Sequence, residues 1–353
     1  LLSRRQRQMC IRDRYEKVGD CSDVVCSTRV RLARNLRSYP FPAHASGKQK
    51  EEIAAKIREA LLSGNSILAD TFSYLPLENL TEEEAVSLVE RHIVSPEFIS
   101  DRRGKAILIS ADESVSIMIN EEDHLRIQIL REGLSLKGAA EMADRIDTLL
   151  GESLDFAFDS EFGFLTQCPT NLGTGMRASV MLHLPALIEN GAMSRISNNL
   201  SKLGLTLRGT YGEGTQVVGG LYQLSNQITL GLSETEAVAN LNAIASQLIE
   251  EERRARKEMS ASIVLQDKID RAAGVMKSAK LLSANEFMEL LSYLRFGLST
   301  GILHGVREEE LNTLSVRVQP ATLMAREGRS MDQNERDILR ATLTREICAK
   351  IKE

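Results

Sequence analysis

The sequence contains no apolar run long enough to cross a bilayer as a helix, so we expect no membrane partner. It also lacks a basic excess, because 44 Lys and Arg residues stand against 49 Asp and Glu residues and the formal net charge is −5. A general nucleic-acid binder presents a strongly basic face, so no direct binding of nucleic acid is expected. Aromatic residues make up only 4% and tryptophan is absent, but a hydrophobic content of 42% still provides for a core.

Cysteine is scarce and its spacing fits no metal site. The five cysteines lie at positions 10, 21, 26, 168 and 348. An odd number without metal-ligand spacing favours free thiols in a reducing compartment over a disulfide framework. We therefore predict a cytoplasmic protein whose cysteines form no metal site.

Two common signatures of nucleotide-binding proteins are missing as well. The sequence has no G-x-x-x-x-G-K-[ST] segment and no complete set of protein-kinase motifs. If ATP binds to this chain, arginine side chains rather than a P-loop must hold its phosphates.

The first residues differ from the rest of the chain. Five arginines lie between positions 4 and 14, the chain does not begin with methionine, and no apolar segment follows. This pattern does not fit a secretory signal. We interpret residues 1–19 as a doubtful or disordered leader and leave them out of the fold prediction.

Alternation of apolar and polar residues predicts several strands. Residues 115–119 and 125–129 alternate with period two, and the short polar segment 120–123 between them predicts a hairpin. Further strands are expected over 180–184, where Pro185 follows, and over 216–230.

Helix signals lie between these strands and dominate after them. Capping-box patterns at Thr81 and Ser233 precede amphipathic stretches, and Ser283 precedes another helix. The charged run 250–258 is interpreted as a solvated helix end or linker. The chain has room for two domains, so we predict an α+β domain with an antiparallel sheet over 20–255 and an all-helical domain over 260–353.

Two motifs place charged side chains on the predicted strands. Arg29 and Arg31 are two residues apart, so on a strand they share one face and suit a polyphosphate. The segment 120–126 places three carboxylates before Arg126, and these need a cation or solvent nearby. Taken alone, the first motif is better explained as an exposed basic strand and the second as a solvated turn.

Two further motifs lie in glycine-rich segments. The segment 168–177 joins Cys168, a flexible turn and Arg177, and resembles an anion-binding loop. Chance is an unattractive explanation for that combination. The segment 208–215 places Glu213 between glycines, as in a mobile loop, although an ordinary hairpin loop has the same composition.

In this order the four motifs resemble those of the ATP:guanido phosphotransferases, over roughly residues 20 to 250. The resemblance implies a catalytic domain whose antiparallel sheet is flanked by helices, as in glutamine synthetase, and which uses ATP with Mg²⁺. It also implies that no side chain binds a metal ion directly, because ATP carries the Mg²⁺. It implies that Glu122 and Glu213 orient a guanidinium and accept its proton, that Cys168 aligns it, and that Glu121 and Asp123 assist. The implied ATP-binding and phosphate-binding residues are Ser27, Arg29, Arg31, His92, Arg126, Arg177 and Arg208.

Three features favour the bacterial protein-arginine kinase branch of this family. The Ser-Thr-Arg-Val-Arg motif stands near the N-terminus, a helical domain follows the catalytic one, and Met181 stands where the metabolic enzymes usually have histidine. The helical part also contains a segment similar to the R-D-x-x-R-A element with which this branch binds phosphoarginine. The residues implied for that regulatory site are Arg336, Asp337, Arg340 and Ala341; taken alone, the segment reads as a charged helix face.

The resemblance therefore predicts transfer of the ATP γ-phosphoryl group to arginine side chains in proteins, in allosterically regulated protein quality control and stress response. It implies several partners: a Clp chaperone-protease, a zinc-containing activator protein, substrates that include a heat-shock repressor, and a second copy in a homodimer. Two alternatives stay open, namely a metabolic kinase that acts on free arginine or a related small guanidine, and a non-catalytic adaptor that binds phosphoarginine.

Overall fold

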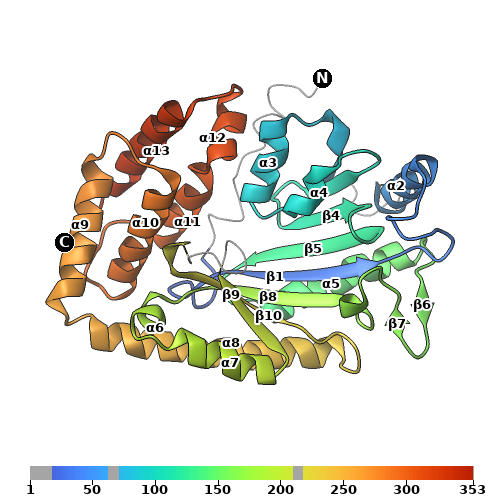
Figure 1. The fold of residues 1–353 in the computed structure, drawn as a ribbon, viewed down its shortest axis with the longest axis horizontal. Helices are drawn as coiled ribbons and strands as arrows, with labels where there is room; N and C mark the ends of the chain where they lie inside the picture. The colour runs from blue at the N-terminus through green and yellow to red at the C-terminus, as the bar shows by residue number, and fades with distance from the viewer. Residues whose placement is uncertain (1–17, 63–70, 210–217, 353) are drawn as a thin grey trace.

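The computed structural model describes residues 18–62, 71–209 and 218–352, and an eight-stranded sheet lies at its centre (Figure 1). Every pairing in this sheet is antiparallel, in the order β2-β3-β4-β5-β1-β8-β10-β9. The strands are β1 (Val25–Arg34), β2 (Phe72–Pro76), β3 (Ala106–Ser110), β4 (Val115–Ile119), β5 (Leu125–Glu132), β8 (Met176–His183), β9 (Leu205–Gly209) and β10 (Leu221–Asn226). A separate hairpin pairs β6 (Phe158–Asp159) with β7 (Gly163–Phe164).

Helices surround the sheet and then continue alone to the C-terminus. Those of the first part are α2 (Gly47–Leu62), α3 (Glu82–Glu90), α4 (Pro96–Ser100), α5 (Leu136–Gly151), α6 (Pro185–Glu189), α7 (Met193–Lys202) and α8 (Glu234–Met259). Those that follow are α9 (Ile263–Ser278), α10 (Ala284–Ser299), α11 (Glu308–Arg317), α12 (Pro320–Glu327) and α13 (Gln333–Cys348). The α+β architecture predicted from the sequence, with its antiparallel sheet and helical C-terminal part, is confirmed.

The two faces of the sheet differ in chemistry. Residues directly opposite each other in an antiparallel pair point to the same side, so the register divides the strands into two faces. One face carries buried aliphatic side chains such as Val30, Ile127 and Val180, and α5 and α8 pack against it. On the other face, β5, β1 and β8 carry mostly polar side chains. On the same face, two short helices cover the strands next to β5. There Leu88 of α3 and Phe98 of α4 pack with Met118 of β4 in a small second core.

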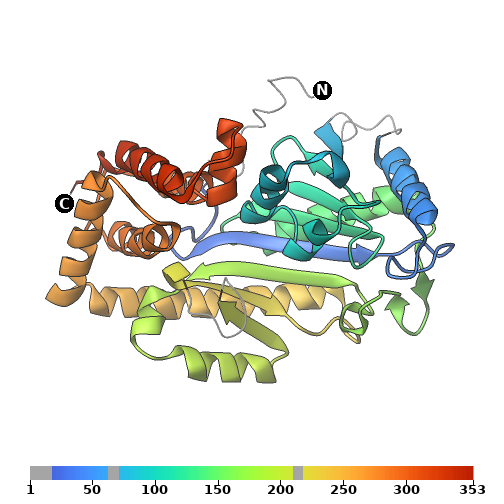
Figure 2. The same ribbon diagram turned by 45° about the horizontal axis from the view of Figure 1, so that its top comes forward.

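The C-terminal helices lie at one end of the sheet and the β6–β7 hairpin at the other, as Figures 1 and 2 both show. Glu90 of α3 joins the two parts, because its carboxylate accepts hydrogen bonds from the backbone N–H groups of Ala321 and Thr322 at the start of α12. On the other side of the junction, His183 at the end of β8 contacts Ser292 of α10 (Nε2 to Oγ, 2.8 Å).

Several local predictions are confirmed, one is wrong in its bounds, and one is confirmed only in part. Both capping boxes form, at Thr81 and at Ser233, and Ser283 caps α10. The strand expected over 216–230 is shorter, because Gly219 and Gly220 adopt positive φ and β10 begins only at Leu221; positions 216 and 217 lie outside the described residues.

The prediction for the charged run 250–258 is confirmed only in part, because the run forms the end of α8 but is not solvated throughout. Glu252 and Arg256 are buried at 0% and 3% exposure. They form an ion pair of 2.7 Å one helical turn apart. Because these two side chains face inward, this end of α8 belongs to the core.

In the described parts of the chain, no helix is long and apolar enough to span a membrane.

Candidate active site

Three neighbouring strands place four arginines on the polar face of the sheet. Arg29 and Arg31 lie on β1, and the register sets Arg31 directly opposite Arg177 of β8. Arg126 of β5 lies opposite Ala33, two residues beyond Arg31 on the same side of β1. The prediction that Arg29 and Arg31 share one face of a strand is therefore confirmed. The two neighbouring strands, β5 and β8, add further guanidinium groups to that face.

This crowding of cations is unfavourable unless an anion is bound. Burial, with Arg126 nearby, lowers the pKa of Arg29 to about 10. Burial and the charges of Arg29, Arg126 and Arg177 lower the pKa of Arg31 well below its usual value. The Nη2 atom of Arg29 donates to Gln223 Oε1 at 3.0 Å, a neutral acceptor that leaves the charge uncompensated. The face is thus built to receive negative charge.

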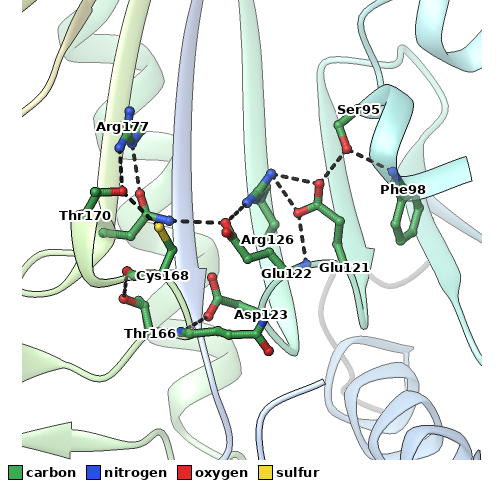
Figure 3. Close-up of polar contacts among 12 residues, drawn as sticks. Ser95, Phe98, Glu121, Glu122, Asp123, Arg126, Thr166, Cys168, Thr170 and Arg177 are labelled. Carbon is green, nitrogen blue, oxygen red and sulfur yellow. Dashed lines mark hydrogen bonds and ion pairs between the residues drawn. The ribbon is translucent and has the colours of Figure 1, made fainter. Parts of the chain in front are cut away.

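Two consecutive carboxylates hold Arg126 (Figure 3). Its Nη1 atom donates to Glu121 Oε1 at 2.8 Å, and its Nη2 atom donates to Glu122 Oε2 at 2.8 Å. Glu121 also accepts a hydrogen bond of 2.5 Å from the hydroxyl of Ser95, which caps α4 by accepting from the backbone N–H of Phe98. The carboxylates of this acidic turn are therefore paired rather than merely solvated.

The two glutamates differ in access. The side chain of Glu121 is 6% exposed and is fully engaged by Arg126 and Ser95. The side chain of Glu122 is 37% exposed and borders a pocket. Glu121 thus orients Arg126, whereas Glu122 can meet a ligand.

Asp123 has different partners from the two glutamates. It is 0% exposed, and its Oδ1 atom accepts hydrogen bonds from Asn35 Nδ2 at 2.7 Å and from the backbone N–H of Gln167 at 2.8 Å. Burial raises the pKa of this carboxyl group. In the described structure Asp123 ties β1 to the segment before Cys168, and it does not line the pocket.

The segment that begins at Cys168 forms the opposite wall. The Cys168 sulfur lies 3.0 Å from Thr170 Oγ1, which also accepts from Arg177 Nη2 at 3.0 Å. Arg177 Nε donates to Asn171 Oδ1 at 2.9 Å, and Asn171 Nδ2 lies 3.4 Å from Glu122 Oε2. Asn171 thereby connects the arginine of β8 to the accessible glutamate of the other wall.

Glycines let this segment pack tightly against the rest of the protein. Gly173 has a φ of 104°, and a Cβ there would lie 2.3 Å from the carbonyl oxygen of Thr229. Gly175 has a φ of 63°, and a Cβ there would lie 2.7 Å from the carbonyl oxygen of Ala33. Both positions therefore require glycine, and Gly175 also lines the pocket beside Ala33.

These elements enclose a pocket of about 270 Å³ between β1, β5 and the 168–177 segment. Its walls combine cations, one accessible carboxylate and a thiol, a donor set that suits a polyanion next to a cationic group. The lining residues are Arg31, Ala33, Glu122, Arg126, Cys168, Thr170, Asn171, Gly175 and Arg177.

Three further predicted site residues, all within the described part of the chain, do not line this pocket. Ser27 lies on β1 on the same face as Arg29, and Arg208 lies at the sheet edge on β9, opposite Gln223. His92 is exposed at the end of α3 in a positive-φ conformation, with its carbonyl bound by Gln128. Glu213 lies outside the described residues.

The predicted regulatory residues lie on α13. Arg340 is 1% exposed and donates to the backbone carbonyls of Val318 and Leu282, at 2.9 and 2.8 Å, and to Asp337 at 2.5 Å. Ala341 is buried, and Arg336 donates to the carbonyl of Met331 at 2.6 Å. These contacts make the segment more than a charged helix face, and its role in binding phosphoarginine stays a prediction.

Three residues that shape the site were not predicted. Ser95 holds Glu121, Asn171 bridges Glu122 and Arg177, and Arg34 fixes the glycine turn through the carbonyl of Thr174 at 2.9 Å. Asn171 lies inside the predicted motif, so its amide could have been singled out. The sequence around Ser95 carries only a helix-cap signal, which says nothing of the contact with Glu121.

Comparison with known proteins gives a consistent result along most of the chain. Residues 52–255 match the family model "ATP:guanido phosphotransferase, C-terminal catalytic domain". Residues 262–353 match the model "Protein-arginine kinase McsB C-terminal domain". Two similar curated proteins are both named "Protein-arginine kinase". One, from Caldanaerobacter subterraneus subsp. tengcongensis, is 45% identical over 90% of this chain and 95% of its own. The other, from Halothermothrix orenii, is 44% identical over 92% and 93%.

Two solved structures of similar fold are a lombricine kinase and a taurocyamine kinase. A lombricine kinase structure has a TM-score of 0.59 and 27% identity, and the match covers 70% of each chain. The duplicated taurocyamine kinase from Schistosoma mansoni, solved with bound components of a transition state analog, has a TM-score of 0.59 and 29% identity. That match covers 77% of this chain and 40% of the other.

Proposed function

The chain belongs to the ATP:guanido phosphotransferase family, and on this premise we propose that it is a protein-arginine kinase, which transfers the γ-phosphoryl group of ATP to arginine side chains in proteins. One observation carries the proposal: Glu122 and Cys168 share one pocket with Arg31, Arg126 and Arg177. A guanidinium and a polyphosphate need opposite partners, and this pocket offers both within about 270 Å³.

The arginine-rich face would bind the phosphates of ATP. Phosphoryl transfer depends mainly on positioning and on stabilising the spreading negative charge. Arg31 and Arg177, which lie side by side on neighbouring strands, would both contact the phosphates, and Arg126 would approach from β5. Arg29 continues the same face along β1, and Arg208 extends it to the edge strand β9. Because these groups are held in place before the ligand arrives, little reorganisation remains for the transfer itself.

The family also implies Mg²⁺, and the residues present fit an ion carried by the nucleotide. No group of three or more His, Cys, Asp or Glu side chains within the described ranges could hold a metal ion. Mg²⁺ is usually bound through substrate phosphates, waters and one or two carboxylates. When bound it would neutralise part of the charge on the transferring group.

The carboxylate of Glu122 would act on the arginine substrate. A free guanidinium has a pKa above ~12 and no available lone pair, so a base must accept its proton as the N–P bond forms. Glu122 is exposed to the pocket, while Arg126 and Asn171 fix the position of one of its oxygens. Cys168 on the opposite wall would align the guanidinium. Glu213 is proposed as the second carboxylate from the family motif alone.

The cellular role is proposed from the resemblance. The chain would act in the cytoplasm as a homodimer and mark proteins, a heat-shock repressor among them, for a Clp chaperone-protease. A zinc-containing activator protein would assist, and phosphoarginine bound by Arg336, Asp337, Arg340 and Ala341 would regulate activity. Among these residues, Asp337 has 16% side-chain exposure and Arg340 has 1%, so access for phosphoarginine requires movement around α13.

The substrate class is tested by comparing two acceptors under the same conditions with Mg-ATP. We expect turnover of arginines in an unfolded protein, such as reduced and carboxymethylated lysozyme, and little turnover of free arginine. Robust turnover of free arginine alone would support the metabolic alternative. Binding of phosphoarginine without phosphorylation of either acceptor would support the adaptor alternative.

A further inference from the structure

The β6–β7 hairpin exposes two aromatic side chains next to the catalytic segment. Phe158 is 49% exposed and Phe162 is 45% exposed, in a chain that has only nine phenylalanines. Phe158 rests with its edge on Phe164, with ring centroids 5.2 Å apart. Exposing two large rings on a short hairpin is costly in water, which points to a partner that covers them.

The same region is acidic. Between Arg145 and Arg177 the sequence contains no Lys or Arg, whereas it contains five Asp and Glu residues. Two of these, Asp159 and Glu161, lie on the hairpin. Hydrogen bonds from the backbone N–H groups of Glu161 and Phe162 lower the pKa of Asp159, which keeps it charged. Two cations lie beside these acids. Arg37 pairs with Asp155 at 3.4 Å and donates to the carbonyl of Phe158 at 3.2 Å. Arg34 pairs with Asp147 at 2.7 Å, so Glu152, Asp159 and Glu161 carry the remaining acidic charge.

A shallow depression adjoins the hairpin. It has a volume of about 500 Å³ and is lined by residues 151–156, which include Glu152, Asp155 and Phe156. The ring of Phe156 lies against Phe164 at 6.4 Å between centroids, so the depression reaches the base of the hairpin. The surface is therefore apolar and acidic over a stretch several side chains wide.

The hairpin is fastened to the walls of the active-site pocket. The backbone N–H of Phe164 donates to the carbonyl of Gly173 at 2.8 Å, inside the catalytic segment. The guanidinium of Arg34 stacks over the Phe164 ring at 3.5 Å and donates to the carbonyl of Ala33, which lines the pocket. Phe164 precedes Cys168 by four residues, so at most roughly 14 Å of extended chain separates them.

We propose that this surface, formed by the β6–β7 hairpin and the depression at residues 151–156, binds the polypeptide that flanks the target arginine. The inference rests on the proposed function, because it requires a protein substrate. An unfolded segment that carries arginine is cationic and exposes apolar side chains, so it complements an acidic surface with two open aromatic rings. A flanking residue three or four positions from the arginine would reach the hairpin.

The test compares a long and a short acceptor in the full chain. The acceptors are reduced and carboxymethylated lysozyme and the tripeptide acetyl-Ala-Arg-Ala-amide, which is too short to reach the hairpin. The main variant is Phe162→Ser, because it leaves the contact between Phe158 and Phe164 in place. Glu161→Gln tests the charge. Ile263→Ser on α9 is the matched control, since Ile263 is 75% exposed on the C-terminal helices.

We expect Phe162→Ser to raise the KM for the unfolded protein about tenfold, the effect of losing one aromatic contact. The KM for the tripeptide, the kcat and the KM for ATP should stay unchanged, and Ile263→Ser should match the unchanged chain. Glu161→Gln should raise the protein KM at low salt and lose this effect at high salt.

Two results would overturn the inference. A protein KM that Phe162→Ser leaves unchanged would show that the hairpin does not bind the substrate. A parallel rise of both KM values would show that the substitution disturbs the pocket instead. If the unchanged chain phosphorylated neither acceptor, the proposed function itself would fail and this inference with it.

Discussion

Arg31 of β1 and Arg177 of β8 lie directly opposite each other in the sheet register. Two like charges in this arrangement destabilise a sheet. The low pKa of Arg31, caused by burial and by three neighbouring arginines, reflects the same repulsion. The fold therefore carries an unfavourable local arrangement at the place where a polyphosphate would neutralise it.

This repulsion predicts a trade-off between stability and binding. Arg31→Gln removes one like charge, so the unliganded protein should gain roughly 1 kcal/mol and about 2 °C in Tm. The same variant should lose most of the Tm increase that ATP gives the unchanged chain, since that increase reports binding to the folded state. Thermal unfolding with and without ATP measures both effects. A variant that is less stable without ATP would contradict the account.

The two consecutive glutamates should respond differently to the same substitution. Glu122→Gln removes the accessible base and should lower kcat by about 10²- to 10⁴-fold while ATP binding persists. Glu121→Gln weakens the hold on Arg126, so it should chiefly raise the KM for ATP, by roughly three- to tenfold. Steady-state kinetics of both variants gives the comparison. Equal loss of kcat in the two would show that Glu121 also takes part directly.

Two ion pairs on α8 provide a matched stability test. Glu252 and Arg256 are buried, and Glu252 also accepts from the backbone N–H groups of Ala186 and Leu187 at the start of α6. Glu252→Gln leaves Arg256 without its buried counter-charge and should cost about 3 kcal/mol or more. Glu250→Gln breaks the exposed pair with Arg253 and should cost less than about 0.5 kcal/mol. Urea denaturation measures both, and similar losses would mean that the buried pair adds nothing specific.

His183 should make stability depend on pH. Burial, together with Arg256 and Arg295, lowers the pKa of His183 well below its usual value. Its Nδ1 atom faces Arg256 Nη2 at 3.1 Å, so Nδ1 accepts and Nε2 donates to Ser292. Because the folded pKa lies below the unfolded one, the unfolded chain takes up the proton first as the pH falls.

The stability contribution of His183 is thus complete above pH ~6.5 and is lost as the pH falls toward the lowered pKa. Between pH 7.5 and 5.5 this loss should be on the order of 1 kcal/mol, and His183→Gln should remove that part of the dependence. His124, whose pKa burial also lowers, remains in both proteins and cancels in the comparison. Urea denaturation at the two pH values provides the measurement, and identical pH dependence would contradict the assignment.

Local patterns predicted much of this molecule, and long-range contacts explain what they missed. The strands 115–119 and 125–129 pair as a hairpin as predicted, because alternation and a polar turn are local signals. The inward position of Glu252 cannot be predicted from local sequence, since a buried i,i+4 ion pair and a solvated one have the same residues at the same spacing. Asp123 likewise reads as a turn carboxylate, and only the distant Asn35 and Gln167 make it a buried anchor.

The same reasoning applies to the site. Arg29 and Arg31 were predicted to share a face, because residues two apart on any strand point to the same side. Their position next to Arg177 could not be predicted, because it depends on which strand pairs with β1. The contact of Ser95 with Glu121 joins a helix cap to a turn 26 residues away, and no spacing rule links them.

The most direct test of the central claim is the chemical identity of the phosphorylated product. The protein is incubated with Mg-ATP and reduced and carboxymethylated lysozyme, and the product is examined by ³¹P NMR and by its stability in acid and alkali. The account predicts an acid-labile phosphorus–nitrogen bond on arginine side chains, absent with Glu122→Gln. Phosphate on hydroxyl groups that survives acid, or phosphoarginine formation that Glu122→Gln leaves unchanged, would contradict it.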